Sequence, residues 1–163
     1  MPEQEFILAY DRFSDAIFRH CYFRVFDADL AKDLTQITFM KTWEYLAKGK
    51  QVDNFQYFLY HVATNLIIDN SRKKKAISLE DIQEKGFDRG MDSRGTLDEQ
   101  IDTRAILELL AKVDEDAKEL LVMRYIDDLS PKDIGKILGL SENAVSVRLN
   151  RAVSKARNII EKS

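Results

Sequence analysis

The spacing of apolar residues is the feature that most restricts the folds open to this chain. Apolar side chains recur every three or four residues over most of its length, and this spacing is typical of the buried face of an α-helix. Three such faces precede residue 76: Phe6, Tyr10, Phe13, Ile17, Cys21 and Val25; Leu30, Leu34, Ile37, Met40, Trp43 and Leu46; and Phe55, Phe58, Leu59, Val62, Leu66 and Ile67. Two more follow residue 96: Leu97, Ile101, Ala105, Leu109 and Val113; and Ala117, Leu120, Leu121 and Tyr125. The sequence therefore predicts an all-α protein.

Residues 76–96 interrupt this pattern. They show little periodicity and hold Gly86, Gly90 and Gly95, half of the six glycines in the chain. Such a composition indicates a linker, so we expect two small helical domains, residues 1–75 and 97–163, joined by an acidic flexible linker over residues 76–96. The alternative is a long structured loop inside one domain, which is uncommon in compact folds.

The net charge of −3 hides an uneven distribution of charged side chains. Residues 1–75 carry 11 basic and 10 acidic side chains, residues 76–130 carry 7 and 15, and residues 131–163 carry 7 and 3. The acid is concentrated in the middle, so the acidic average does not exclude nucleic-acid binding by the two ends.

The composition excludes several other classes of protein. No apolar run approaches the roughly 20 residues that cross a bilayer, and the acidic N-terminus lacks a secretory signal, so we expect no membrane insertion and a cytoplasmic location. Cys21 lies among apolar residues and indicates a small buried hydrophobe, and with only His20 and His61 beside it no metal site is expected. The chain shows no nucleophile, base and acid set and no phosphate-binding loop, so we expect neither an enzyme nor a cofactor.

Residues 130–157 predict a helix-turn-helix. Ser130 can cap a short helix that starts at Pro131, because serine accepts from a free amide and proline needs none at the first position. Gly139 is expected to end that helix, and Ser141 to cap the next. Gly135 is expected to let the second helix cross closely.

The second of these helices has a polar outer face. Its predicted inward residues are Ala144, Val145, Leu149, Ala152 and Val153, which leaves Glu142, Asn143, Ser146, Arg148, Asn150 and Arg151 outside. Such a helix can enter the major groove, where arginine reads guanine and asparagine reads adenine. Lys155 and Arg157 suit phosphate contacts. The alternative is a helical hairpin with a solvated charged face.

Aromatic residues crowd the start of the third predicted helix, at Phe55, Tyr57, Phe58 and Tyr60. Such stripes are more often core packing, but four aromatics in six residues exceed the needs of one buried face. Exposed aromatics beside lysines stack on unpaired bases, at roughly 1–3 kcal/mol per base. The basic block at residues 72–75 would then lie near duplex phosphate. Alternatively, these cations only stabilise the helix by their favourable interaction with its dipole.

Together these segments resemble the extracytoplasmic-function class of bacterial sigma factors over nearly the whole chain. Residues 33–43, DLTQITFMKTW, are similar to the helix by which that family binds RNA polymerase. Residues 58–65, FLYHVATN, with Asp69 and the basic block, are similar to its −10 segment, and residues 129–157 to its −35 reading domain. The resemblance implies a transcription initiation factor without catalysis of its own that binds core RNA polymerase and promoter DNA.

The resemblance also implies site residues by position. Core polymerase is expected to contact Asp33, Gln36, Phe39 and Lys41. The −10 element is expected to contact Lys50, Gln51, Asp53, Asn54, Phe55, Tyr60, Asn65, Arg72, Lys73 and Lys74, with the loop 50–54 and Asn65 capturing a flipped base. The −35 element is expected to contact Ser141, Asn143, Ser146, Val147, Arg148, Asn150, Arg151 and Lys155.

Four positions depart from the family's pattern. Ile37 stands where glutamate is usual and Lys32 where an acid is frequent, which puts the usual polymerase-clamp contacts in doubt. Phe58 replaces a common tryptophan, and Ser146 replaces a frequent basic residue, which leaves the −35 preference open. Such factors are usually held inactive by an anti-sigma factor, which is therefore an expected partner. The alternative function is a stand-alone helix-turn-helix regulator that does not act as a polymerase specificity subunit.

Overall fold

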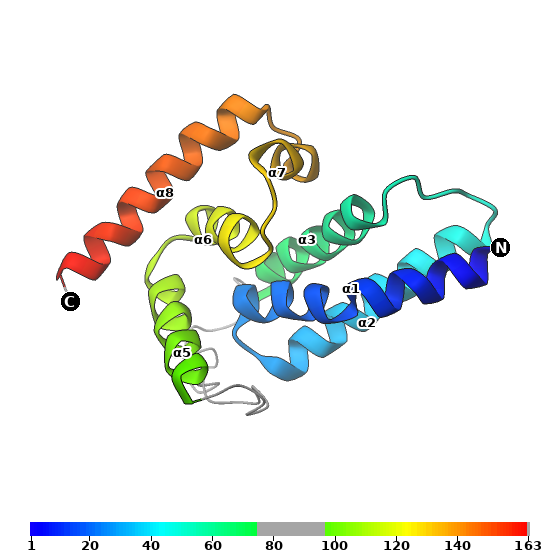
Figure 1. Ribbon diagram of the computed structural model, residues 1–163, viewed down its shortest axis with the longest axis horizontal. Helices are drawn as coiled ribbons and strands as arrows, with labels where there is room; N and C mark the ends of the chain where they lie inside the picture. The colour runs from blue at the N-terminus through cyan, green and yellow to red at the C-terminus, as the bar shows by residue number, and fades with distance from the viewer. Residues whose placement is uncertain (75–96, 163) are drawn as a thin grey trace.

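The computed structural model describes residues 1–74 and 97–162, and every regular element in these two ranges is a helix (Figure 1). The N-terminal half holds α1 (Pro2–Val25), α2 (Ala28–Ala47) and α3 (Phe55–Lys74). The C-terminal half holds α5 (Leu97–Lys112), α6 (Glu115–Leu121), the π-helical segment η1 (Val122–Ile126), α7 (Pro131–Leu138) and α8 (Glu142–Lys162). The all-α prediction is confirmed for these ranges, and the predicted linker, residues 76–96, lies outside them.

The N-terminal half is a three-helix unit in which α1 and α2 run antiparallel and α3 packs against both (Figure 1). The chain turns between the first two helices at Phe26, whose φ of 60° is left-handed, and Asp27 then caps α2 by accepting from the Leu30 amide. Cys21 is fully buried in the core, as predicted. Burial raises the pKa of its thiol to about 12, so the thiol is protonated at neutral pH.

The inward face of this unit differs in part from the predicted one. Four residues predicted to face inward are exposed instead: Tyr10, Ile37, Met40 and Trp43. In α2 the buried positions include Thr38 and Thr42, whose hydroxyls donate to the carbonyls of Leu34 and Thr38 at 2.7 and 2.8 Å. A threonine that bonds to its own helix can be buried at little polar cost. Apolar periodicity overlooks such residues, and the buried face of α2 therefore differs from the predicted one.

A π-helical segment influences which side chains of the C-terminal half face inward. In η1 the Asp127 amide bonds to the Val122 carbonyl, five residues earlier, which inserts one extra residue into the turn. Val122 and Met123 are fully buried as a result, while Tyr125, which was predicted to face inward, is 62% exposed. Ala105 in α5 is also exposed rather than buried, because Leu107 and Leu110 form that helix's inner face.

The predicted helix-turn-helix is confirmed in its local geometry. The Ser130 hydroxyl accepts from the Asp133 amide, and the Ser141 hydroxyl accepts from the Ala144 amide, each at 3.1 Å. Both helices are therefore capped. Gly139 lies between them with a left-handed φ of 72°, which glycine adopts without a steric penalty.

The atoms that approach Gly135 belong to the backbone of the turn that leads into α8. A Cβ atom at this position would lie 2.5 Å from the carbonyl oxygen of Leu140, in the turn. The Leu140 amide also donates to the Gly135 carbonyl, at 2.8 Å. The space left by the missing side chain is therefore filled by the backbone of the turn, and not by side chains of a crossing helix.

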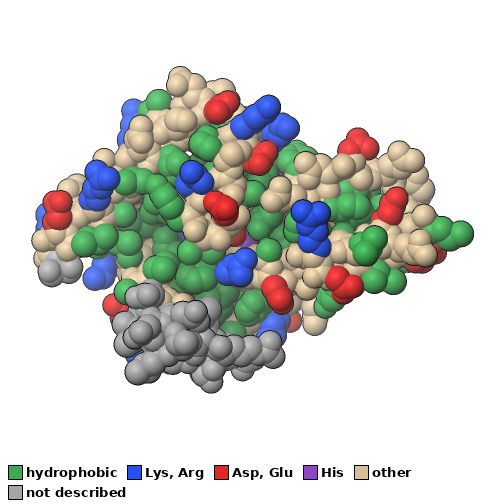
Figure 2. Space-filling view, viewed as in Figure 1, with side chains coloured by type: hydrophobic (Ala, Val, Ile, Leu, Met, Phe, Trp, Pro, Cys, Tyr) green, Lys and Arg blue, Asp and Glu red, His purple; other side chains and the backbone are tan. Residues whose placement is uncertain are grey.

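The two halves pack against each other. Helix α3 contacts α7, and α1 contacts η1, so α6 and α7 lie beside α3 and the end of α1 (Figure 1). The C-terminal half also has an apolar groove between α5 and α8, and hydrophobic side chains gather over this surface (Figure 2). Among the helices of the described ranges, none combines the length and apolar character of a membrane span.

Candidate nucleic-acid interface

The outer face of α2 carries three of the four residues expected to bind polymerase. Asp33, Gln36 and Lys41 are exposed. Phe39 is only 3% exposed, and its ring centroid lies 4.9 Å from that of Tyr10 in α1. Phe39 therefore supports α2 from inside and leaves the contact surface to its neighbours.

An exposed apolar strip lies on the same helix, formed by Ile37, Met40 and Trp43. Exposed apolar side chains beside polar ones are typical of a surface that binds another protein. The predicted set did not include this strip, because helical periodicity assigned its members to the core. The signal that identifies it is the run Leu34, Thr38 and Thr42, which takes the inward positions at four-residue spacing.

The loop before α3 is ordered by its own side chains. The Asn54 side chain accepts from the Tyr57 amide at 3.0 Å and caps α3. The Lys50 ammonium lies 5.2 Å from the centroid of the Tyr45 ring, a cation–π contact. Asn54 and Lys50 are exposed, as are Gln51 and Asp53, so the structure brings these four predicted −10 residues together at one end of α3.

The aromatic residues of α3 divide between core and surface. Tyr60, expected to contact the −10 element, is 3% exposed, and its ring meets the His20 ring edge-on at 5.2 Å. Phe55 is half-buried against the core. Tyr57, by contrast, is exposed. The surface that could stack on a base is therefore centred on Tyr57 rather than on Tyr60.

Tyr57, His61 and Asn65 form a row along one face of α3, because they are four residues apart. The rings of Tyr57 and His61 stack at 5.5 Å, and the Asn65 amide nitrogen lies 3.3 Å from His61 Nε2. His61 Nδ1 lies 3.3 Å from the carbonyl of Ile137 in α7. A ring that carries its proton on Nδ1 donates to this carbonyl and accepts from Asn65. Of the row, only Asn65 was among the expected −10 contacts, although Tyr57 was one of the four aromatic residues considered for base stacking; the four-residue spacing is the signal for His61.

Helix α8 presents its polar side to the surface, as predicted. Asn143, Arg148, Asn150 and Arg151 are exposed, as is Ser141 before the helix, and Ser146 is half-buried. Val147 is 44% exposed among these polar side chains. Val145, Leu149 and Ala152 are buried, and they fix the helix against the rest of the C-terminal half.

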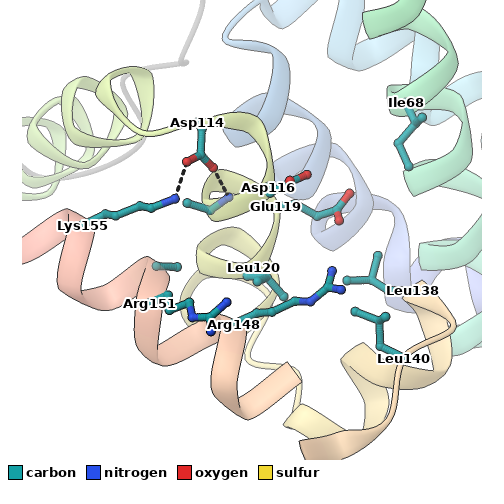
Figure 3. Close-up of a pocket in the computed structure, with 12 residues that line it drawn as sticks. Ile68, Asp114, Asp116, Glu119, Leu120, Leu138, Leu140, Arg148, Arg151 and Lys155 are labelled. Atoms are coloured by element: carbon teal, nitrogen blue, oxygen red, sulfur yellow. Dashed lines mark hydrogen bonds and ion pairs between the residues drawn. The ribbon is translucent and has the colours of Figure 1, made fainter. Parts of the chain in front are cut away.

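Part of this helix faces a cleft rather than open solvent (Figure 3). Arg148, Arg151 and Lys155 line one side of it, and Asp114, Asp116 and Glu119 line the other. Ile68 of α3 and Leu138 of α7 also border the cleft. The Arg148 side chain extends from α8 toward Glu119 and Leu138 (Figure 3). Three cations expected to meet DNA therefore face acidic side chains in this structure.

Asp114 joins α6 to α8 within this cleft. Its carboxylate accepts from Lys155 Nζ at 2.5 Å and from the Ala117 amide at 2.8 Å. The hydrogen bond from Lys155, followed by the bond from the Ala117 amide, holds the pKa of Asp114 below its usual range. Lys155, expected to contact the −35 element, is thus paired within the chain.

Asp114→Asn is expected to lower the thermal midpoint of unfolding at pH 7, because losing an exposed ion pair costs about 0.2–1 kcal/mol. The folded pKa of Asp114 is depressed, so its contribution is complete above the unfolded value of about 3.9 and is lost as the pH falls through the lower folded value. The difference in thermal midpoint between the variant and the wild type should therefore shrink as the pH falls below about 3.9. Circular dichroism melts, with the exposed Asp116→Asn as control, check this; a difference unchanged at pH 2.5 would contradict it.

Comparison with protein families accounts for both halves of the chain. Residues 9–77 match the model of sigma-70 region 2, and residues 103–155 match that of sigma-70 region 4. The ECF RNA polymerase sigma factor SigW of Bacillus subtilis (strain 168) is 28% identical over 151 residues, which are 86% of this chain and 81% of SigW. The chain belongs to the extracytoplasmic-function class of sigma-70 factors.

Another relative of this sigma factor is the ECF RNA polymerase sigma factor BldN of Streptomyces coelicolor, 26% identical over 148 residues. That match covers 88% of this chain but 56% of BldN. Two solved structures share the fold of this sigma factor. CnrH in complex with the cytosolic domain of CnrY has a TM-score of 0.73 at 19% identity and covers 99% of this chain and 90% of CnrH. RpoE of Bartonella quintana, in complex with the anti-sigma factor NepR, has a TM-score of 0.73 at 20% identity. The match covers 98% of this chain and 96% of RpoE.

Proposed function

We propose that this sigma factor binds core RNA polymerase and directs it to specific promoters, where it recognises and helps to melt the −10 element and reads the −35 element. The observation that carries the proposal is the presence, in one chain, of an exposed mixed apolar and polar face on α2, a polar loop and an exposed tyrosine at the start of α3, and a capped helix-turn-helix. A stand-alone regulator needs only the last of these. The protein has no catalytic role in the reaction.

The roles divide between two domains. Residues 1–75 bind core polymerase and the −10 element, residues 97–163 bind the −35 element, and residues 76–96 join them. On α2, Asp33, Gln36 and Lys41 contact polymerase together with the exposed apolar strip, which supplies the desolvated centre of such an interface. Ile37, at a position where the family usually has glutamate, makes this contact less acidic.

The −10 element meets the start of α3. The loop residues 50–54 and Asn65 receive a base flipped from the strand, and Tyr57 provides a face on which a neighbouring base stacks. Unstacking a base costs a few kcal/mol, so a preformed pocket edge lowers the barrier to melting. Tyr60 contributes from the core, through its contact with His20, rather than by touching DNA.

The −35 element meets the outer face of α8. Asn143, Asn150 and Arg151 have the side-chain groups that read bases by hydrogen bonds, and Val147 can contact a thymine methyl group. Ser141 caps the helix, and the free amides at its N-terminus favour a phosphate. Lys155 contacts phosphate only after it leaves Asp114.

We further propose a cytoplasmic location, where polymerase and chromosome lie, and an anti-sigma factor as a second protein partner. Support for the partner comes from the RpoE structure, which was solved as a complex with the anti-sigma factor NepR, and from CnrH, solved with CnrY.

Run-off transcription with purified core polymerase and a promoter library tests the function directly. The full chain is expected to co-purify with core polymerase and to select a subset of promoters with a common −10 and −35 pair. A chain that binds DNA but does not associate with core polymerase would overturn the proposal and leave the stand-alone regulator.

Replacing Arg72 and Lys73 with alanine is expected to weaken promoter binding by the polymerase complex in a salt-dependent way. Both side chains are exposed in the last turn of α3. The slope of log K against log salt should fall by about 0.9 for each phosphate that the variant no longer binds. Binding is measured between 50 and 200 mM salt, with Arg12→Ala, an exposed residue of α1, as control. An unchanged slope in the double variant would mean that these residues do not contact phosphate and only interact with the helix dipole.

A further inference from the structure

Three side chains of α3 form a row, and the proposed −10 contacts account for only its two ends. Tyr57, His61 and Asn65 follow one another at four-residue spacing, so they lie on one face of the helix. Tyr57 is 37% exposed and Asn65 is exposed, whereas His61 between them is half-buried. The two outer side chains are therefore open to a ligand, and the middle one is less accessible.

His61 contacts both neighbours in the row. Its ring stacks on that of Tyr57, with centroids 5.5 Å apart and an angle of 20° between the ring planes. Its Nε2 atom lies 3.3 Å from Nδ2 of Asn65. An amide nitrogen only donates, so Nε2 accepts this hydrogen bond, and the amide oxygen of Asn65 takes no part in it. One imidazole thus holds a ring on one side and an amide on the other.

This arrangement belongs to α3 and its own cap. The Tyr57 amide donates to the Asn54 side chain at 3.0 Å, which ties the row to the loop before α3. His61 Nδ1 lies 3.3 Å from the carbonyl oxygen of Ile137 in α7, which favours the tautomer that carries its proton on Nδ1. The stack and the bond from Asn65 involve residues of α3 alone, so they do not depend on the position of the C-terminal half.

Order in these side chains has a direct effect on affinity. A flexible side chain that becomes fixed on binding loses rotamer freedom, which weakens binding by about two- to tenfold for each side chain. A side chain that is already held in place avoids this loss. A base that stacks on Tyr57 also extends the existing stack of two rings. Both ends of the row can therefore bind single-stranded DNA at a smaller entropic cost.

We propose that His61 is a positioning residue, which holds the Tyr57 ring and the Asn65 amide in the arrangement that receives the separated strand of the −10 element. His61 itself does not contact DNA. The inference rests on the proposed function, because that function assigns Tyr57 and Asn65 to the −10 element. It adds a residue that acts on the DNA only through its two neighbours.

Two substitutions separate the two contacts of His61. His61→Phe keeps a ring beside Tyr57 but offers no acceptor to Asn65, whereas His61→Gln keeps a hydrogen-bonding group but has no ring. Asn70→Ala is the matched control, since Asn70 is also half-buried in α3 but lies on the opposite side of the helix.

The full chain, assembled with core polymerase, is tested on two DNA probes. One is a single-stranded oligonucleotide that carries the −10 sequence of a promoter selected by the wild type, and the other is the −35 duplex of the same promoter. Each substitution is expected to weaken single-strand binding by about two- to tenfold, and His61→Ala by about the product of the two factors. Binding of the −35 duplex should not change, and Asn70→Ala should change neither affinity.

Repeating the substitutions in two backgrounds identifies the route by which His61 acts. In an Asn65→Ala background, His61→Phe should have no further effect, because the side chain that it releases is already absent, and His61→Gln should keep its effect. In a Tyr57→Ala background the two results should be reversed. Far-ultraviolet circular dichroism checks that each variant keeps its helices.

A loss from His61→Phe that survives in the Asn65→Ala background would overturn the positioning role, because the ring would then contact DNA itself. Unchanged single-strand binding by His61→Ala, or an equal loss for the −35 duplex, has the same consequence. The proposed function fails separately, through an absence of core-dependent transcription by the wild type. A wild type that transcribes while His61→Ala binds the oligonucleotide normally refutes only the positioning role.

Discussion

Gly135→Ala is expected to destabilise the C-terminal half by about 1–3 kcal/mol, the usual cost of forcing extra atoms into a packed site. The added Cβ would lie 2.5 Å from the Leu140 carbonyl oxygen, a backbone atom that cannot rotate away. Alanine in place of glycine inside a helix otherwise stabilises it by about 1 kcal/mol. The sign of the change in the free energy of unfolding therefore distinguishes the two effects, and chemical denaturation followed by circular dichroism measures it.

Gly139→Ala is the matched control for this prediction. Its Cβ would meet no atom within 4 Å, but its φ of 72° is left-handed. An alanine there costs roughly 1–2 kcal/mol from backbone strain alone, without displacing the turn. A Gly135→Ala variant as stable as the wild type would mean that the turn relaxes, and that the close approach of Leu140 does not constrain this position.

Arg151→Ala is expected to weaken promoter binding by the polymerase complex by roughly 1–3 kcal/mol at one −35 base and to relax the preference for that base. Arg151 is exposed on α8 and borders the cleft that Asp116 and Glu119 line from α6. Binding of wild type and variant to promoters with each of the four bases at every −35 position measures the effect.

Arg157→Ala is the control for Arg151. Arg157 is exposed two turns nearer the C-terminus and is expected to contact phosphate only. The substitution should weaken binding to all promoters alike and reduce the salt slope by about 0.9. If Arg151→Ala also weakens every sequence equally, Arg151 positions the helix on the backbone and does not read a base.

Local features of the fold were predictable because their causes lie within a few residues of sequence. The caps at Ser130 and Ser141 and the left-handed Gly139 each depend on one side chain and the adjacent backbone. The same applies to the exposed polar face of α8, whose buried side is marked by apolar residues at helical spacing.

Features set by packing were predicted less well. Tyr60 is of a residue type that often stacks on bases, but its ring packs against His20 of another helix. Large apolar residues such as Ile37, Met40 and Trp43 usually lie in a core. In α2, however, threonines that are hydrogen-bonded to their own helix occupy the inner face. In each case the residue type is compatible with either environment, and distant neighbours decide which one it has.

The amino-acid sequence was sufficient for the helical class, the helix-turn-helix and the sigma-factor motifs, because periodicity, capping and turn chemistry act over short distances. Only the tertiary structure revealed that Asp127 meets His20, 107 residues away, and that Glu119 faces Arg24. Nothing near either residue in the sequence specifies its partner, since such a contact depends on how two separately folded halves pack. The promoter-binding residues could therefore be proposed from local patterns, whereas the contact between the two halves could not.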